Sequence, residues 1–132
     1  MSSYTIYGDR ISGNCLKVKW TADYLGANYE WRDVSVVDQQ TRMDSYLKIN
    51  PAGQVPAIVL PSGQTLAQSN AIIVFLNRAF NGDLLPPDEY LHAKVFEWLF
   101  WEQYSHEPAI AVRRFQKAYL QKPDNAIDPA LM

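Results

Sequence analysis

Hydrophobic and polar positions change their spacing several times along the first 80 residues, and each change predicts a new element. Short runs bounded by turn residues, several of them rich in aromatic and β-branched side chains, predict four strands, over residues 4–7, 29–37, 55–60 and 64–67. Apolar residues at helical spacing, with capping or breaker residues at their ends, predict three helices, over residues 15–25, 44–49 and 70–80. The predicted order is therefore β-α-β-α-β-β-α.

The connections between these elements predict how the strands pair. A helix joins the first two strands, so these strands should run parallel. The tight turn Pro61-Ser62-Gly63 joins the last two strands, so they should run antiparallel. Strands and helices that alternate in this way indicate a layered α/β domain.

A different pattern follows residue 80. Residues 81–87 predict a linker, and Asp88 begins a helix that should reach about Leu120. Large apolar side chains crowd this helix: Phe96, Trp98, Leu99, Phe100, Trp101 and Tyr104. They indicate burial on more than one side, against further helices or a second subunit. The expected organisation is a domain at 1–80, a linker at 81–88 and a helical segment at 89–132.

Composition and charge exclude several classes of protein. Of the 132 residues, 48% are hydrophobic and 20% are charged, which is typical of globular proteins. The net charge of −2 gives no general attraction to nucleic acid or anionic membranes, and no apolar run approaches the ~20 residues of a membrane span. A single cysteine, Cys15, and two distant histidines, His92 and His106, predict neither a disulfide nor a metal site. Because the N-terminus also shows no secretion signal, we expect a cytoplasmic protein.

The segment 50–56 has the sequence Asn-Pro-Ala-Gly-Gln-Val-Pro and carries the most information about chemistry. Its last proline stands at the head of a predicted strand, where the missing N–H costs a ladder hydrogen bond. A cis Val55–Pro56 bond would turn the N–H and C=O of Val55 outward, where an extended peptide could pair with them. A trans proline that enters an edge strand is the alternative, and spacing alone favours it because cis bonds are a minority.

Two further segments lie where a strand meets a helix. Ser69, in the segment 68–72, is placed at a helix N-terminus, where free N–H groups and the helix dipole attract a carboxylate. Ser12, in the segment 12–18, occupies the equivalent place before the first helix. For each serine taken alone, an ordinary N-cap is the simpler interpretation.

Together, in this order and spacing, the three segments resemble the N-terminal domain of the glutathione S-transferase family. That domain has the same β-α-β-α-β-β-α order, a cis-proline after a valine, and an acidic residue or glutamine followed by serine before its third helix. The resemblance is close over residues 4–80 and continues over about 86–120, into the family's all-α domain. It implies an α/β thioredoxin-like domain followed by an incomplete all-α segment.

The resemblance also implies roles in binding glutathione. Val55 would pair its backbone with the cysteinyl part of glutathione, while Gln68 and Ser69 would hold the γ-glutamyl carboxylate. Gln54 would lie near the glycyl end. Arg42 stands where some relatives place a basic contact to the glycyl carboxylate. By the same resemblance, Lys48 is the alternative for that contact.

For catalysis, the segment 12–15 resembles the serine-type pattern of the family. Ser12 would donate to the glutathione sulfur and favour the thiolate, which is scarce at neutral pH because a free thiol has a pKa near ~8.5. Asn14 would supply a second donor. Cys15 is the rival, because a helix N-terminus would favour its own thiolate and direct the chemistry to mixed disulfides. A third interpretation is that Cys15 only packs as a small hydrophobic residue.

Three functions remain open at this point. The first is a transferase that conjugates glutathione, as co-substrate, to small electrophiles in detoxification, as a homodimer. The second is a glutathione-dependent thiol oxidoreductase that uses Cys15. The third is a non-catalytic glutathione-binding module, because the chain stops soon after the first long helix, whereas relatives continue through helices that build the electrophile pocket.

Overall fold

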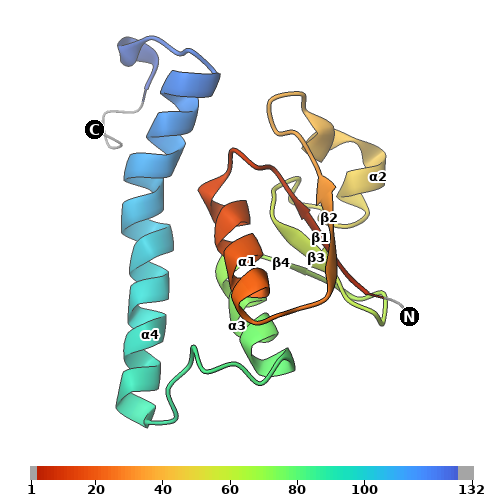
Figure 1. Cartoon of the computed structure of the whole chain (residues 1–132). Helices are drawn as coiled ribbons and strands as arrows, with labels where there is room; N and C mark the ends of the chain where they lie inside the picture. Colours follow the sequence, from red (N-terminus) through yellow and green to blue (C-terminus); the bar gives the residue numbers. More distant parts are fainter. Residues whose placement is uncertain (1–2, 128–132) are drawn as a thin grey trace. The chain divides into compact units, whose positions relative to one another are not determined.

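Figure 1 shows the computed structural model of the chain, which describes residues 3–127. The chain forms two compact units, Met1–Leu85 and Pro86–Met132.

The first unit contains a four-stranded mixed sheet. Its strands are β1 (Tyr4–Gly8), β2 (Tyr29–Asp33), β3 (Ala57–Val59) and β4 (Thr65–Ala67), in the spatial order β2-β1-β3-β4. β1 runs parallel to β2, and the hairpin strands β3 and β4 run antiparallel. Both predicted pairings are therefore confirmed, and the unit has the thioredoxin-like fold.

Helices cover both sides of this sheet (Figure 1). The first unit contains α1 (Gly13–Tyr24), α2 (Asp44–Leu47) and α3 (Ser69–Ala79). Ile6 and Ile58 form a core with residues of α1 and α3, whereas Tyr7 and Ala57 pack with Tyr46 of α2. Because neighbouring residues of a strand point to opposite sides, α1 and α3 lie on one side of the sheet and α2 on the other.

The second strand is shorter than predicted. The alternating residues 34–37 lie beyond β2, where the chain turns instead of continuing the sheet. The backbone N–H of Val36 donates to the Asp9 carboxylate at 2.8 Å, and the N–H of Ser35 donates to the Gln40 side chain at 2.7 Å. These side-chain acceptors replace ladder partners, and a 3-10 turn that was not predicted, η1 (Gln40–Arg42), follows.

One long helix dominates the second unit, as predicted. It begins as α4 (Glu89–Trp101), where the Asp88 side chain accepts a hydrogen bond from the N–H of Leu91 at 2.8 Å. It continues through three segments with wider, π-type hydrogen bonds, η2 (Glu102–His106), η3 (Pro108–Val112) and η4 (Phe115–Tyr119). A short turn, η5 (Asp124–Ala126), follows. Within residues 3–127, no helix combines the length and the hydropathy needed to cross a membrane.

Candidate functional site

The register of the sheet brings three loop segments to one of its ends. Tyr7, near the carboxyl end of β1, aligns with Ala57, the first residue of β3. Ala57 in turn aligns with Ala67, the last residue of β4. The loop after β1, the segment before β3 and the segment after β4 therefore meet at this end. They are the segments singled out from the sequence, at 12–18, 50–56 and 68–72.

The segment before β3 is a tightly bonded turn. The Val55–Pro56 bond is cis, as the family resemblance implies, and not trans, as spacing alone would favour. The carbonyl oxygen of Gln54 accepts hydrogen bonds from the Tyr46 hydroxyl and from Asn50 Nδ2, each at 2.7 Å. Among residues 3–127, no hydrogen-bond partner reaches the backbone N–H of Val55. The turn therefore presents an unoccupied backbone donor at the end of the sheet.

Gly53 lets a basic side chain approach this turn. Its φ is +61°, in the left-handed region that favours glycine, and an added Cβ would lie 2.8 Å from Arg42 Nη1. The guanidinium of Arg42 thus lies against the turn, although the residue as a whole is exposed. The Gln54 side chain is also exposed, as is Lys48 at the end of α2.

The segment after β4 contains a strained residue. Gln68 has φ +71° and ψ 115°, a conformation that costs on the order of 1–3 kcal/mol in residues with a side chain. Gln68 occupies the N-cap position of α3, so the prediction that Ser69 is the N-cap is wrong: Ser69 is the first helical residue. Ser69 is buried, and its hydroxyl donates to Asn14 Oδ1 at 3.2 Å. This bond joins the start of α3 to the start of α1.

The loop after β1 positions Ser12. The Ser12 N–H donates to the Asp9 carbonyl at 3.0 Å, and the Asp9 carboxylate accepts from the N–H of Ile11 at 3.1 Å. The Ser12 side chain is the N-cap of α1, because its oxygen accepts from the N–H of Cys15 at 3.3 Å. Capping uses an acceptor lone pair of the hydroxyl and leaves its O–H as a donor. The N-cap interpretation is therefore correct, and it is compatible with a second role.

Cys15 is placed for packing rather than for reaction. Its side chain is fully buried. Burial raises the pKa of the Cys15 thiol, and the hydrogen bond with Ser12 opposes this rise only in part. Because a thiolate is the reactive form, this environment disfavours Cys15 as a nucleophile.

Two residues of the site were missed in the sequence analysis. Tyr46 lies in the four-residue helix α2 and touches Gln54 across eight positions of sequence, a contact that no local pattern reveals. Asp9 has no role in the sequence analysis, yet it organises the loop that carries Ser12. Within residues 3–127, no three His, Cys, Asp or Glu side chains are grouped to hold a metal ion.

Comparisons with known proteins agree on one family. A family model described as the glutathione S-transferase N-terminal domain matches residues 11–79. A solved glutathione S-transferase from Pseudomonas fluorescens is 42% identical, with a TM-score of 0.86 over 94% of this chain and 61% of that chain. Glutathione S-transferase theta-3 of Mus musculus is 32% identical over 74% of this chain and 41% of its own length. Protein URE2 of Candida glabrata is 27% identical over 97% of this chain and 38% of its own length. The chain thus spans between about a quarter and a half of the length of the curated relatives it matches.

Proposed function

The chain belongs to the glutathione S-transferase family, and from this premise we propose that it binds glutathione and transfers its thiolate to small electrophiles. The observation that carries the proposal is the strand register, which brings the segments of Ser12, Val55 and Ser69 to one end of the sheet. The buried Cys15, whose pKa is raised, makes the thiol oxidoreductase the less favoured alternative.

The proposed binding mode uses one group for each part of glutathione. The backbone of Val55 pairs with the cysteinyl part, since its N–H has no partner within residues 3–127. The γ-glutamyl carboxylate lies at the start of α3, where the first N–H groups of a helix lack intrahelical acceptors and the dipole is positive. Gln68 adds a side-chain donor there. The single O–H of Ser69 donates to Asn14 Oδ1 in this structure and would turn to the carboxylate when glutathione binds. Arg42 and Gln54 lie beside the turn that would meet the glycyl end.

In the proposed reaction, Ser12 donates its O–H to the glutathione sulfur while its oxygen continues to cap α1. A hydrogen bond to the thiolate lowers the thiol pKa, and each unit of lowering corresponds to about 1.4 kcal/mol. The thiolate then attacks the electrophilic carbon, and the leaving group departs with the electron pair of the broken bond. Asn14, already joined to Ser69, would stand as a second donor.

The wider biological setting is also a proposal. We expect the protein to act in the cytoplasm, because a reducing environment suits the free thiol of Cys15. We also expect it to serve detoxification. Substrate choice belongs to the electrophile pocket, for which the family uses helices after the first long one.

Three assays test this function against its alternatives. We expect retention on immobilised glutathione, conjugation of 1-chloro-2,4-dinitrobenzene, and no reduction of glutathione mixed disulfides. Failure to bind glutathione would contradict the proposal. Binding without either activity would support the non-catalytic module instead.

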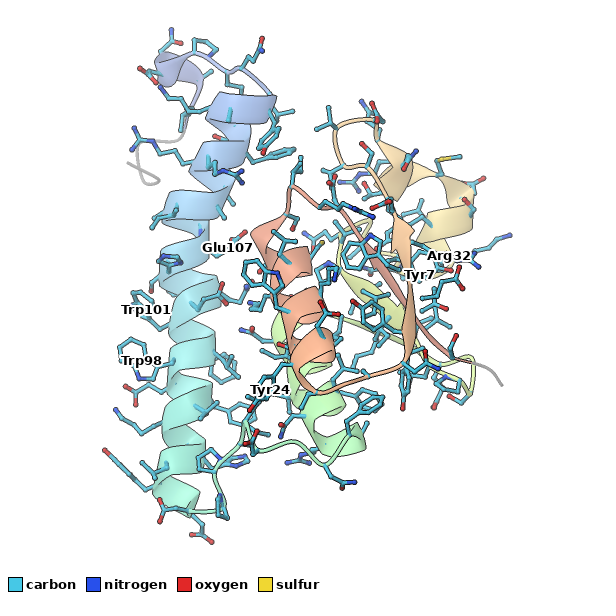
Figure 2. All side chains as sticks on the ribbon, in the orientation of Figure 1. Tyr7, Tyr24, Arg32, Trp98, Trp101 and Glu107 are labelled. Atoms are coloured by element: carbon cyan, nitrogen blue, oxygen red, sulfur yellow. The ribbon has the colours of Figure 1, made fainter. Side chains whose placement is uncertain are left out.

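We also expect a homodimer, because the long helix exposes aromatic side chains. The exposed fractions are 58% for Trp98, 71% for Phe100, 48% for Trp101 and 87% for Tyr104, whereas Phe96 and Leu99 are half-buried. Figure 2 shows Trp98 and Trp101 on the same side of α4, with ring centroids 5.5 Å apart. Burying such side chains contributes about 25 cal/mol per Å².

Sedimentation over a dilution series checks this expectation. Replacement of both Trp98 and Trp101 by glutamate should raise the dimer dissociation constant at least about tenfold, since each buried aromatic side chain is worth over 1 kcal/mol. A wild-type protein that stays monomeric at every concentration would refute the expected homodimer.

A further inference from the structure

The peptide unit that joins Gln54 to Val55 is held from one side by two side chains. A carbonyl oxygen has two lone pairs, and here both are engaged, one by the Tyr46 hydroxyl and one by Asn50 Nδ2. Both donors are buried, with exposed fractions of 4% for Tyr46 and 6% for Asn50. The Gln54 carbonyl is therefore held in a single orientation.

The orientation of this carbonyl determines where the next N–H points. The bond between Gln54 and Val55 is trans, since Val55–Pro56 is the cis bond recorded in residues 3–127. In a planar trans peptide, the C=O and the N–H point in opposite directions. The Val55 N–H therefore points away from Tyr46 and Asn50, and it meets no acceptor within residues 3–127.

We propose that Tyr46 and Asn50 are positioning residues for the ligand: by holding the Gln54 carbonyl, they aim the Val55 N–H at the cysteinyl part of glutathione. The inference rests on the proposed function and adds to it two residues that would not themselves touch glutathione. It gives a role to both of the neutral donors that converge on one carbonyl.

The two donors are themselves fixed in place. The Asn50 N–H donates to the Tyr46 carbonyl at 3.0 Å, and Asn50 Oδ1 accepts from the N–H of Ala52 at 3.2 Å. The Tyr46 ring packs edge-on against Tyr7, with 6.1 Å between ring centroids. Burial raises the pKa of Tyr46, so its hydroxyl remains protonated and able to donate. The support for the Val55 amide is therefore rigid.

The test is Tyr46→Phe, which keeps the ring and removes only the donor. Titration calorimetry with glutathione should give a dissociation constant about three- to tenfold above that of the wild type, the equivalent of one neutral hydrogen bond. Asn50→Ala, checked for folding by its thermal midpoint, should have an effect in the same direction. Hydrogen exchange supplies a second readout: saturation with glutathione should protect the Val55 amide in the wild type and protect it less in Tyr46→Phe.

Tyr29→Phe is the matched control. It also removes a tyrosine hydroxyl with a short hydrogen bond, to Asp23 Oδ1 at 2.6 Å, but it lies at the opposite end of the sheet. Glutathione affinity should stay at the wild-type value in this control. Equal affinity and equal Val55 protection in wild type and Tyr46→Phe would overturn the inference alone. Failure of the wild type to bind glutathione would instead overturn the proposed function, and this inference with it.

Discussion

Ser12→Ala is expected to lower kcat/KM for conjugation by about 10- to 150-fold while the dissociation constant of glutathione changes little, since a hydrogen bond to a charged group contributes about 1.5–3 kcal/mol. The reason is that the Ser12 hydroxyl acts on the thiolate and not on the peptide of the ligand. The pKa of the bound thiol should rise in the variant, so its pH–rate profile should move to higher pH by about one to two units. Above both pKa values the bound thiol is ionised in either protein, and the difference in rate should narrow.

A control must separate this effect from the loss of a helix cap. Ser12 caps α1, and replacing a capping serine by alanine costs about 0.5–2 kcal/mol, whereas glycine at this position costs only a few tenths. Ser12→Gly should therefore fold with near wild-type stability and still have the lowered kcat/KM for conjugation. Cys15→Ala should retain conjugation. If Ser12→Ala is silent and Cys15→Ala abolishes activity, the catalytic role belongs to Cys15.

Ser69→Ala should weaken glutathione binding by about 10- to 100-fold, because a charge-assisted hydrogen bond to the γ-glutamyl carboxylate is lost. In the ligand-free protein the same O–H donates to Asn14 at 3.2 Å and joins the starts of α3 and α1, so the variant loses that bond when no ligand is bound. Titration calorimetry measures the affinity, and the thermal midpoint reports any loss of stability.

Ser62→Ala is the matched control for this prediction. Ser62 lies exposed in the turn between β3 and β4, and within residues 3–127 its hydroxyl bonds only to Gln64, at 3.0 Å and 3.4 Å. Its removal should leave affinity unchanged. A glutathione analogue without the γ-glutamyl α-carboxylate should bind wild type and Ser69→Ala equally; an unchanged difference between the two proteins would refute the carboxylate contact.

The overall fold could be predicted because the connections between the strands determine how the strands pair. A helix between β1 and β2 and a tight turn between β3 and β4 determine how these strands run, and both features are visible in local sequence. The end of β2 could not be predicted in this way. Residues 34–37 alternate like a strand, yet the Asp9 carboxylate, 27 residues earlier, withdraws the N–H of Val36 from the sheet.

The candidate site shows the same limit. The turn at 50–56 was recognisable because Gly53 and Pro56 have strong backbone preferences of their own. The helix start at Ser69 was misplaced by one residue, because nothing local announces that Gln68 adopts φ +71°. Tyr46 and Asp9 were missed because their roles depend on contacts that no local pattern reveals: Tyr46 contacts Gln54 eight positions later, and the Asp9 carboxylate contacts Val36, 27 positions later. Local backbone preferences therefore predict where the turns of this protein lie, whereas tertiary contacts determine which groups the turns expose.

The placement of the site within the first unit has an evolutionary consequence. Every residue proposed to hold glutathione lies in Met1–Leu85, a unit with its own hydrophobic core. The helical unit can therefore diverge, be exchanged or be lengthened under selection for new electrophiles while the glutathione residues remain under separate constraint. Under the proposed function, such a division would let the first unit keep supplying the same nucleophile while the helical unit changes with the substrate.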